Sequence, residues 1–193
     1  PPFRASIPGR LPARAPRGRR LFPERRARHP GAMPTPALRL AEWQRWRAEL
    51  EARGRFDGAG SPFWSELLEL SAGYRVRAHS PYSGLSLAAL ILGADGRLFA
   101  GVNVENASYG LTNCAERSAV FHAVSEGQQR FLLCFLQGQA PLPIPPCGAC
   151  RQVLFEFAPD LWVISRGSQG QLACARLDRL LPGAMGAADL PRS

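Results

Sequence analysis

Two short runs in this 193-residue chain together hold three thiols and one carboxylate. The first is Cys-Ala-Glu-Arg at residues 114–117, and the second is Pro-Cys-Gly-Ala-Cys-Arg at residues 146–151. A catalytic zinc ion usually takes three protein ligands, thiolates among them, and leaves its fourth tetrahedral position open. We therefore predict that one Zn²⁺ per chain is bound by three thiols: Cys114, Cys147 and Cys150. The carboxylate of Glu116 is then free for proton transfer.

The spacing of these residues indicates the elements that must position them. Cys147 and Cys150 are three residues apart, so at the start of a helix their sulfurs lie on one face. Cys114 and Glu116 are two residues apart and would point about 200° apart in a regular helix. We therefore expect Cys114 at a helix cap, where the backbone is not yet helical, so that both side chains reach one cavity.

In combination, these motifs resemble the zinc-dependent cytidine deaminase family in its small homotetrameric form. Asn-Val-Glu-Asn at residues 103–106 precedes them and adds to the likeness, which extends from about residue 61 to the C-terminus. The resemblance implies a pyrimidine nucleoside substrate, a five-stranded fold and active sites shared between the subunits of a homotetramer.

The chemistry that we infer is hydrolytic deamination. Glu116 takes a proton from water at the zinc and passes it to N3 of the cytosine ring, while the oxygen attacks C4. Glu116 then carries the second proton to the departing amino group. Ammonia and the uracil nucleoside are the products.

Three thiolates around one Zn²⁺ give a net charge of minus one, which weakens the metal as an acid. Unpaired N–H groups and the macrodipole at two helix N-termini offset part of this charge. Arg117 and Arg151 directly follow metal ligands. In the resembling family an arginine near these positions hydrogen-bonds a ligand sulfur, so we expect both to withdraw charge from the thiolates.

A separate stretch bears on the substrate. Asn103 and Glu105 alternate on a predicted strand and so point to one side, where an amide and a carboxylate can hold the vicinal hydroxyls of a sugar. The family's corresponding Asn and Glu grip the nucleoside sugar. Tyr109 and Ala115 also match family positions near the substrate, Ala115 through its backbone.

Two positions depart from the family pattern. Leu85 stands where the family has the Phe that packs at the base, and Met185 stands where a Phe reaches a neighbouring pocket. Each lost aromatic contact weakens base stacking by about 1 kcal/mol. The sequence therefore leaves two possibilities open: a base pocket that is looser than in the family, and a natural substrate other than plain cytidine.

The formal net charge of +9 comes entirely from the first 60 residues. They carry 14 Arg against five acids, whereas residues 61–193 carry 10 Arg and 10 acids. The neutral core argues against nucleic-acid binding. With no apolar run long enough to span a membrane and no signal peptide, we expect a cytoplasmic protein, in which Cys134 and Cys174 are buried free thiols.

We expect three segments along the chain. Residues 1–32 hold seven Pro and nine Arg without apolar periodicity, which predicts a disordered tail. An over-long gene start before Met33 and an organelle transit peptide both remain open for it. Residues 33–60 form an amphipathic helix, over 40–53, and a linker. Residues 61–193 form the catalytic domain.

Within that domain, strands are expected at residues 85–92, 98–104, 131–136, 161–165 and 171–175. Helices are expected at residues 65–78, with Ser61 or Ser65 as N-cap, and at 114–126, 147–157 and 177–181. This alternation predicts a three-layer α/β/α sandwich with a five-stranded mixed sheet.

Three alternatives remain. The first is a related deaminase of a cytosine nucleoside analogue or antibiotic. The second reads Cys147-Gly148-Ala149-Cys150 as a redox dithiol, which leaves Cys114 and Glu116 unexplained. The third combines a structural zinc with a nucleic-acid-binding tail, but a structural site normally has four protein ligands. No histidine has a motif position that suggests the fourth: His29, His79 and His122.

Overall fold

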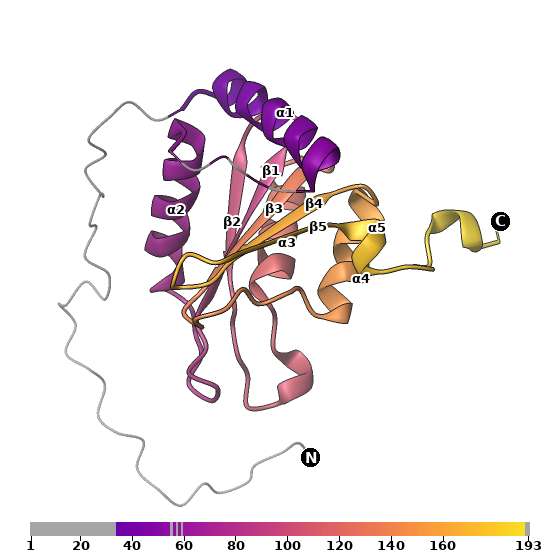
Figure 1. The fold of residues 1–193 in the computed structure, drawn as a ribbon. Coiled ribbons are helices and arrows are strands. Elements are labelled where there is room, and N and C mark those ends of the chain that lie inside the picture. The colour runs from indigo at the N-terminus through magenta and orange to yellow at the C-terminus, as the bar shows by residue number, and fades with distance from the viewer. Residues whose placement is uncertain (1–33, 55, 57, 59, 192–193) are drawn as a thin grey trace, which may run out of the picture.

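The computed structural model describes residues 34–54, 56, 58 and 60–191, so the predicted tail at residues 1–32 lies outside the described residues. A five-stranded sheet in the order β2-β1-β3-β4-β5 forms the centre of the fold (Figure 1). Its strands are β1 (Leu87–Gly93), β2 (Leu98–Val102), β3 (Phe131–Gly138), β4 (Trp162–Arg166) and β5 (Leu172–Arg176). Strands β3 and β4 are parallel and the other neighbouring pairs antiparallel, which confirms the predicted mixed sheet.

Helices cover both faces of the sheet. On one face lie α1 (Pro36–Arg53) and α2 (Pro62–Arg75), and on the other lie α3 (Ala115–Ser125), α4 (Gly148–Phe157) and α5 (Leu177–Leu180). The predicted three-layer α/β/α sandwich is confirmed. Among the described residues, no helix combines the length and apolar character needed to cross a membrane.

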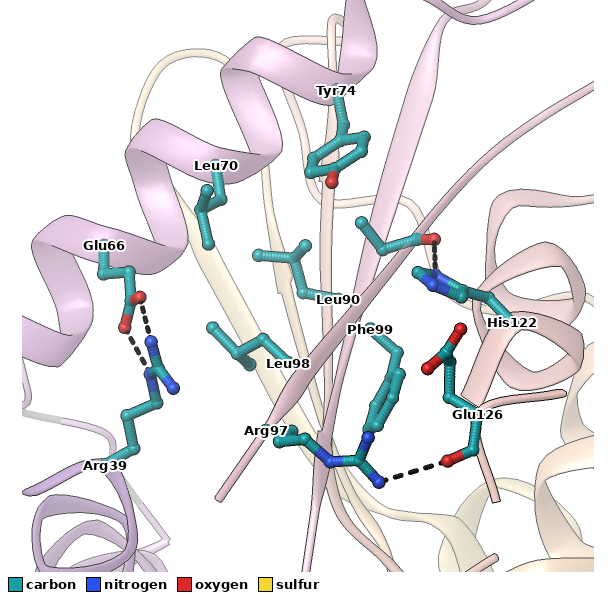
Figure 2. Close-up of a pocket in the computed structure, with 11 residues that line it drawn as sticks. Arg39, Glu66, Leu70, Tyr74, Leu90, Arg97, Leu98, Phe99, His122 and Glu126 are labelled. Carbon is teal, nitrogen blue, oxygen red and sulfur yellow. Dashed lines mark hydrogen bonds and ion pairs between the residues drawn. The ribbon is translucent and has the colours of Figure 1, made fainter. Parts of the chain in front are cut away.

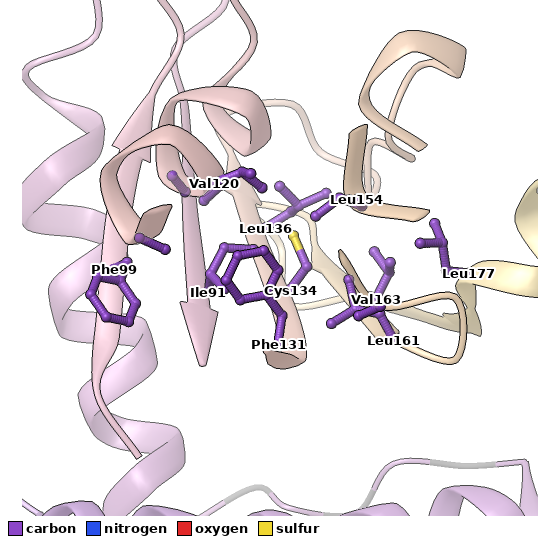
Figure 3. Packing of buried hydrophobic residues seen from close by; sticks show 14 of the residues in the cluster. Ile91, Phe99, Val120, Phe131, Cys134, Leu136, Leu154, Leu161, Val163 and Leu177 are labelled. Carbon is purple, nitrogen blue, oxygen red and sulfur yellow. The ribbon is translucent and has the colours of Figure 1, made fainter. Parts of the chain in front are cut away.

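The central strands alternate between two apolar cores. On β1, Leu90 and Leu92 pack toward α1 and α2, whereas Ala89 and Ile91 pack toward α3. Figure 3 shows Ile91 within the second of these cores. Side chains of a strand point alternately to opposite faces, so a strand buried on both faces consists almost entirely of apolar residues. The uninterrupted apolar run of β1 has this cause.

Capping residues determine where the first two helices begin. The Ser61 hydroxyl accepts from Trp64 N at 3.2 Å and caps α2. Thr35 caps α1 by accepting from Leu38 N at 3.3 Å, with Pro36 as the first helical residue. Helix α1 therefore begins four residues before the predicted start at residue 40. The prediction followed the apolar stripe, whereas a Thr N-cap followed by Pro starts a helix whether or not apolar residues are present.

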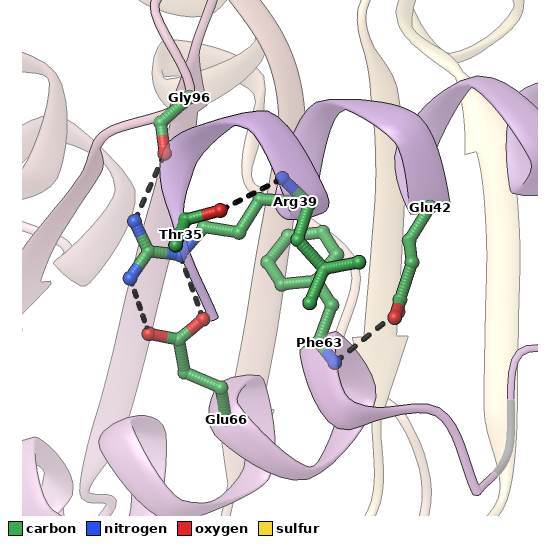
Figure 4. Close-up of polar contacts among 7 residues, drawn as sticks. Thr35, Arg39, Glu42, Phe63, Glu66 and Gly96 are labelled. Carbon is green, nitrogen blue, oxygen red and sulfur yellow. Dashed lines mark hydrogen bonds and ion pairs between the residues drawn. The ribbon is translucent and has the colours of Figure 1, made fainter. Parts of the chain in front are cut away.

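Helix α1 packs on its own subunit through aromatic and ionic contacts. The Trp46 ring stacks on Phe63 of α2 with centroids 4.9 Å apart. The Arg39 guanidinium donates to both oxygens of Glu66 at 2.7 and 2.6 Å, and Glu42 accepts from Phe63 N at 3.2 Å (Figure 4). These contacts pack α1 on its own subunit.

Gly101 on β2 allows α3 to approach the sheet closely. A Cβ atom at Gly101 would lie 2.2 Å from the backbone nitrogen of Ala119 and 2.4 Å from the carbonyl oxygen of Ala115. Because both atoms belong to helix backbone, α3 would have to move as a whole.

We expect Gly101→Ala to lower the free energy of unfolding by about 1–3 kcal/mol or more, as overpacking does. Zinc affinity should also fall, because α3 begins at Cys114. The matched control is Gly73→Ala in α2, where no heavy atom lies within 4 Å of the new Cβ. That change should stabilise by about 0.5–1 kcal/mol. Chemical denaturation of both variants is the measurement, and a neutral Gly101→Ala would contradict the tight contact.

Candidate functional site

Three cysteine sulfurs converge at the N-termini of two helices on the same face of the sheet. Cys114 is the N-cap of α3 and Cys147 the N-cap of α4, both with extended backbone, and Cys150 lies in the first turn of α4. The Sγ of Cys147 lies 3.9 Å from that of Cys114 and 3.5 Å from that of Cys150. All three ligand atoms lie within 4.8 Å of one another. The expectation that Cys114 lies at a helix cap is confirmed.

These distances fit a zinc ion. With a zinc–sulfur bond of about 2.3 Å, sulfurs at the corners of a tetrahedron lie about 3.8 Å apart. The distances from Cys147 Sγ to the other two sulfurs, 3.9 and 3.5 Å, fall on either side of this value. Three sulfurs leave one tetrahedral position for water or substrate. One zinc ion per chain is therefore the cofactor of this site.

The surroundings favour the thiolate form of the ligands. The Arg117 guanidinium donates from Nη2 to Cys114 Sγ at 3.8 Å and to the Thr112 carbonyl at 3.0 Å. Hydrogen bonding from Cys150, and then from Arg117, lowers the pKa of Cys114 to about 5. The positive ends of α3 and α4 act in the same direction. The expected arginine contact to a ligand sulfur is thus present at Arg117.

Arg151 has other contacts than those expected from its place beside Cys150. Its Nε donates to the Pro146 carbonyl at 2.9 Å, and its Nη1 donates to the Leu180 carbonyl at 2.6 Å. A partly buried arginine at a helix start can reach the loop before the helix as easily as a ligand sulfur. Arg151 therefore ties α5 to the loop that delivers Cys147, and its role as a sulfur partner is corrected to this one.

Glu116 is the second residue of α3 and is 5 % exposed. Burial raises the pKa of its carboxyl group, and the negative charge at Cys114 adds to that shift. A hydrogen bond with the Cys150 side chain acts in the opposite direction. Glu116 stands two residues after the Cys114 N-cap, so its carboxyl group and the sulfur cluster lie at the same end of α3.

Asn103 and Glu105 lie beyond the end of β2 rather than within it. The strand ends at Val102, and Val104 forms isolated bridges to His79 and Asn113. The predicted strand, 98–104, was therefore two residues too long. After Val102 the chain stops pairing with β1, and Val104 pairs instead with His79 and Asn113. The segment remains extended, but Asn103 is buried at 7 % exposure and Glu105 only partly buried.

Both polar side chains hold the loop before β1. The Asn103 amide accepts from Leu87 N at 2.8 Å and donates to the Leu85 carbonyl at 2.7 Å. The Glu105 carboxylate accepts from Tyr82 N at 2.9 Å. The sequence pattern indicated only a sugar grip and missed these contacts, which join residues at least 16 positions apart.

A cavity of about 370 Å³ opens beside Glu105. It is lined by Tyr82, Ser83, Glu105, Tyr109 and Thr112. Tyr109 is 76 % exposed and meets Tyr82 edge to face, with ring centroids 6.0 Å apart. Thr112 connects this cavity to the sulfur cluster, because its carbonyl accepts from Arg117. Of the remaining predicted contacts, Leu85 is partly buried and Ala115 fully buried.

A larger cavity, of about 560 Å³, lies elsewhere, where β2 runs between α2 and α3 (Figure 2). It includes His122 and Glu126 from the C-terminal end of α3, whereas Glu116 lies in the first turn. Its Arg39 is paired with Glu66, and His122 Nδ1 bonds the Ala100 carbonyl at 3.1 Å. The smaller cavity is connected to Cys114 through Thr112 and Arg117, and it is therefore the better candidate for a substrate site.

Comparison with known proteins agrees with this geometry. Residues 64–166 match the family described as the cytidine and deoxycytidylate deaminase zinc-binding region. The chain is 45 % identical to cytidine deaminase from Halalkalibacterium halodurans over 117 residues, which are 60 % of this chain and 89 % of that protein. It is 39 % identical to the enzyme from Sporosarcina psychrophila over 126 residues, or 65 % and 93 % of the two chains.

Solved structures show the same relationship. Cytidine deaminase from Burkholderia pseudomallei superposes with a TM-score of 0.60 at 42 % identity, covering 63 % of this chain and 98 % of that one. Cytidine deaminase from Mycobacterium tuberculosis gives a TM-score of 0.55 at 37 % identity, covering 64 % of this chain and 97 % of that one. This chain belongs to the zinc-dependent cytidine deaminase family.

Proposed function

We propose that this protein is a cytidine deaminase that hydrolyses cytidine or deoxycytidine to uridine or deoxyuridine and ammonia. The observation that carries the proposal is the convergence of three sulfurs and one buried carboxyl group at the starts of α3 and α4. Three ligands suit a catalytic zinc, and a carboxyl group beside them suits proton transfer.

The chain's residues account for the steps of the reaction. Cys114, Cys147 and Cys150 would hold the zinc ion, which would supply the Lewis acidity that makes water a competent nucleophile near neutral pH. Glu116 accepts a proton from the attacking water and donates it to ring N3, while the water oxygen bonds to C4. Glu116 then takes the remaining proton from the oxygen now bonded to C4 and transfers it to the amino group, the C4–N bond breaks as the C4 carbonyl forms, and ammonia leaves. A buried carboxyl group is suited to accept and donate in turn.

For substrate binding, we assign the sugar to Asn103 and Glu105. Each retains hydrogen-bonding capacity beyond its loop contacts, since an amide offers four positions and a carboxylate about four. Tyr109 and Leu85 border the same region, and Ala115 contributes its backbone beside Glu116. Support comes from the cavity next to Glu105.

Assembly into a homotetramer with shared active sites is part of the proposal. Tyr109 lines the cavity beside Glu105 and is exposed, and further large apolar side chains are exposed elsewhere on the chain: Leu111, Phe121 and Met185. Exposed apolar residues near a functional site are typical of surfaces that a neighbouring subunit covers. We assign residues 61–193 to the catalytic domain. Helix α1 precedes the family match, which begins at residue 64, and covers one face of the sheet together with α2.

The reaction belongs to pyrimidine salvage, since it converts one nucleoside into another that can be reused. We propose that it takes place in the cytoplasm. None of the five cysteines forms a disulfide, including the exposed Cys147. A reducing compartment keeps such cysteines available as metal ligands, because disulfides rarely form there.

A substrate panel on protein of measured zinc content tests the proposal. Loss of cytosine absorbance is followed with cytidine, deoxycytidine and a blasticidin-type antibiotic. We expect turnover of the two nucleosides and none of the antibiotic. Turnover of the antibiotic alone would favour the analogue deaminase, which the replacement of Phe by Leu85 leaves as the second candidate.

A further inference from the structure

The Glu105 carboxylate receives several hydrogen bonds from one short turn. Tyr82 N donates to Oε2 at 2.9 Å and Ser83 N donates to the same oxygen at 3.2 Å. The Ser83 hydroxyl donates to the other oxygen, Oε1. Among the causes that lower the pKa of Glu105, the Ser83 hydroxyl is the largest.

These contacts limit what Glu105 can offer to a ligand. A carboxylate has about four acceptor positions, so three bonds leave about one for a sugar hydroxyl. The hydroxyl bond at Oε1 prevents the carboxylate from rotating about its terminal bond. The Ser83 side chain therefore determines the direction of the remaining lone pair together with the two N–H groups that bond Oε2.

Ser83 also connects the sugar side of the site to the base side. Its Oγ accepts from Leu85 N at 3.0 Å, so one hydroxyl bonds both Glu105 and the backbone of Leu85. Gly84 between them has φ of 69°, a conformation that favours glycine, and its carbonyl accepts from the Gln139 side chain. The turn at residues 82–85 is thus held from both sides.

We propose that Ser83 is a positioning residue for the nucleoside sugar, acting by orienting the Glu105 carboxylate toward one sugar hydroxyl. This inference rests on the proposed function, and it predicts an effect on ligand affinity that requires the sugar hydroxyls. The chemical step, at Glu116 and the sulfurs, is not affected.

The test is Ser83→Ala, measured by titration calorimetry with uridine and with 2′,3′-dideoxyuridine on the zinc-loaded protein. Loss of an orienting hydrogen bond to a charged group should weaken uridine binding by about tenfold. Binding of the dideoxy compound should change by less than about twofold, because it has no hydroxyl for Glu105. The KM for cytidine should rise with kcat nearly constant.

Three further variants separate positioning from a merely structural role. Ser83→Thr keeps the hydroxyl and should restore uridine affinity. Ser80→Ala is the matched control, because the Ser80 hydroxyl bonds Ser86, at 3.1 Å, in the same loop. In a Glu105→Ala background, Ser83→Ala should have no additional effect, since the carboxylate that it orients is gone.

Equal weakening of both ligands by Ser83→Ala, or unchanged uridine binding, would overturn the proposal. So would additive effects in the double variant. Failure of the proposed function gives a different result, because wild-type protein with one zinc per chain would then fail to deaminate cytidine at all.

Discussion

Glu116→Gln should lower kcat for cytidine by about 10²–10⁴-fold, the range that a positioned general acid–base contributes. The amide has nearly the shape of the carboxyl group but cannot accept a proton from water or deliver one to N3. Since the three sulfurs are untouched, zinc content should stay at one per chain. Steady-state kinetics with elemental analysis of the same preparation measure both quantities.

Glu126→Gln is the matched control for this experiment. Glu126 is the C-cap of α3, the same helix whose first turn holds Glu116, and it is exposed. Its variant should retain normal kcat. Near-normal activity of zinc-loaded Glu116→Gln would show that Glu116 does not carry the proton, and another residue of the site would then have to do so.

Cys150→Ala should abolish both zinc binding and activity. Cys150 is the fully buried member of the cluster, and its replacement by Ala removes one of the three metal ligands. Two remaining protein ligands do not hold zinc in the coordination that catalytic sites require. Thermal stability should also fall, because a metal that binds only the folded state stabilises it.

The control for Cys150→Ala is Cys174→Ala, which removes a thiol outside the cluster. Cys174 was expected to be buried and is only partly so, because β5 is an edge strand with fewer neighbours. Its variant should keep one zinc per chain. Metal-free wild-type protein with a reversible Cys147–Cys150 disulfide would instead support the redox alternative.

Local sequence signals predicted the elements of this fold because each has a local physical cause. The apolar run of β3 and the helix starts at Cys114 and Cys147 depend on residues close together in the chain. Predicted boundaries differ from the observed ones by a few residues, most at α1. There the helix begins at the Thr-Pro cap, several residues before the first of its buried side chains.

Contacts between distant residues could not be predicted in this way. Arg151 follows a ligand as Arg117 does, yet its guanidinium bonds Leu180, 29 residues away. Likewise Asn103 clamps the chain at Leu85 and Leu87. Nothing in the spacing of either residue distinguishes these partners, since hydrogen-bond geometry depends on how the loops pack.

By itself, the sequence determined the metal and the chemistry of this protein. Three thiols and a carboxylate at helix-start spacing admit few other sites, because ligand type and helix geometry are local properties. Only the tertiary structure decided which arginine reaches a sulfur and how Ser83 bonds Glu105. These depend on the meeting of segments that are distant in the chain, where packing, rather than spacing, brings the atoms together.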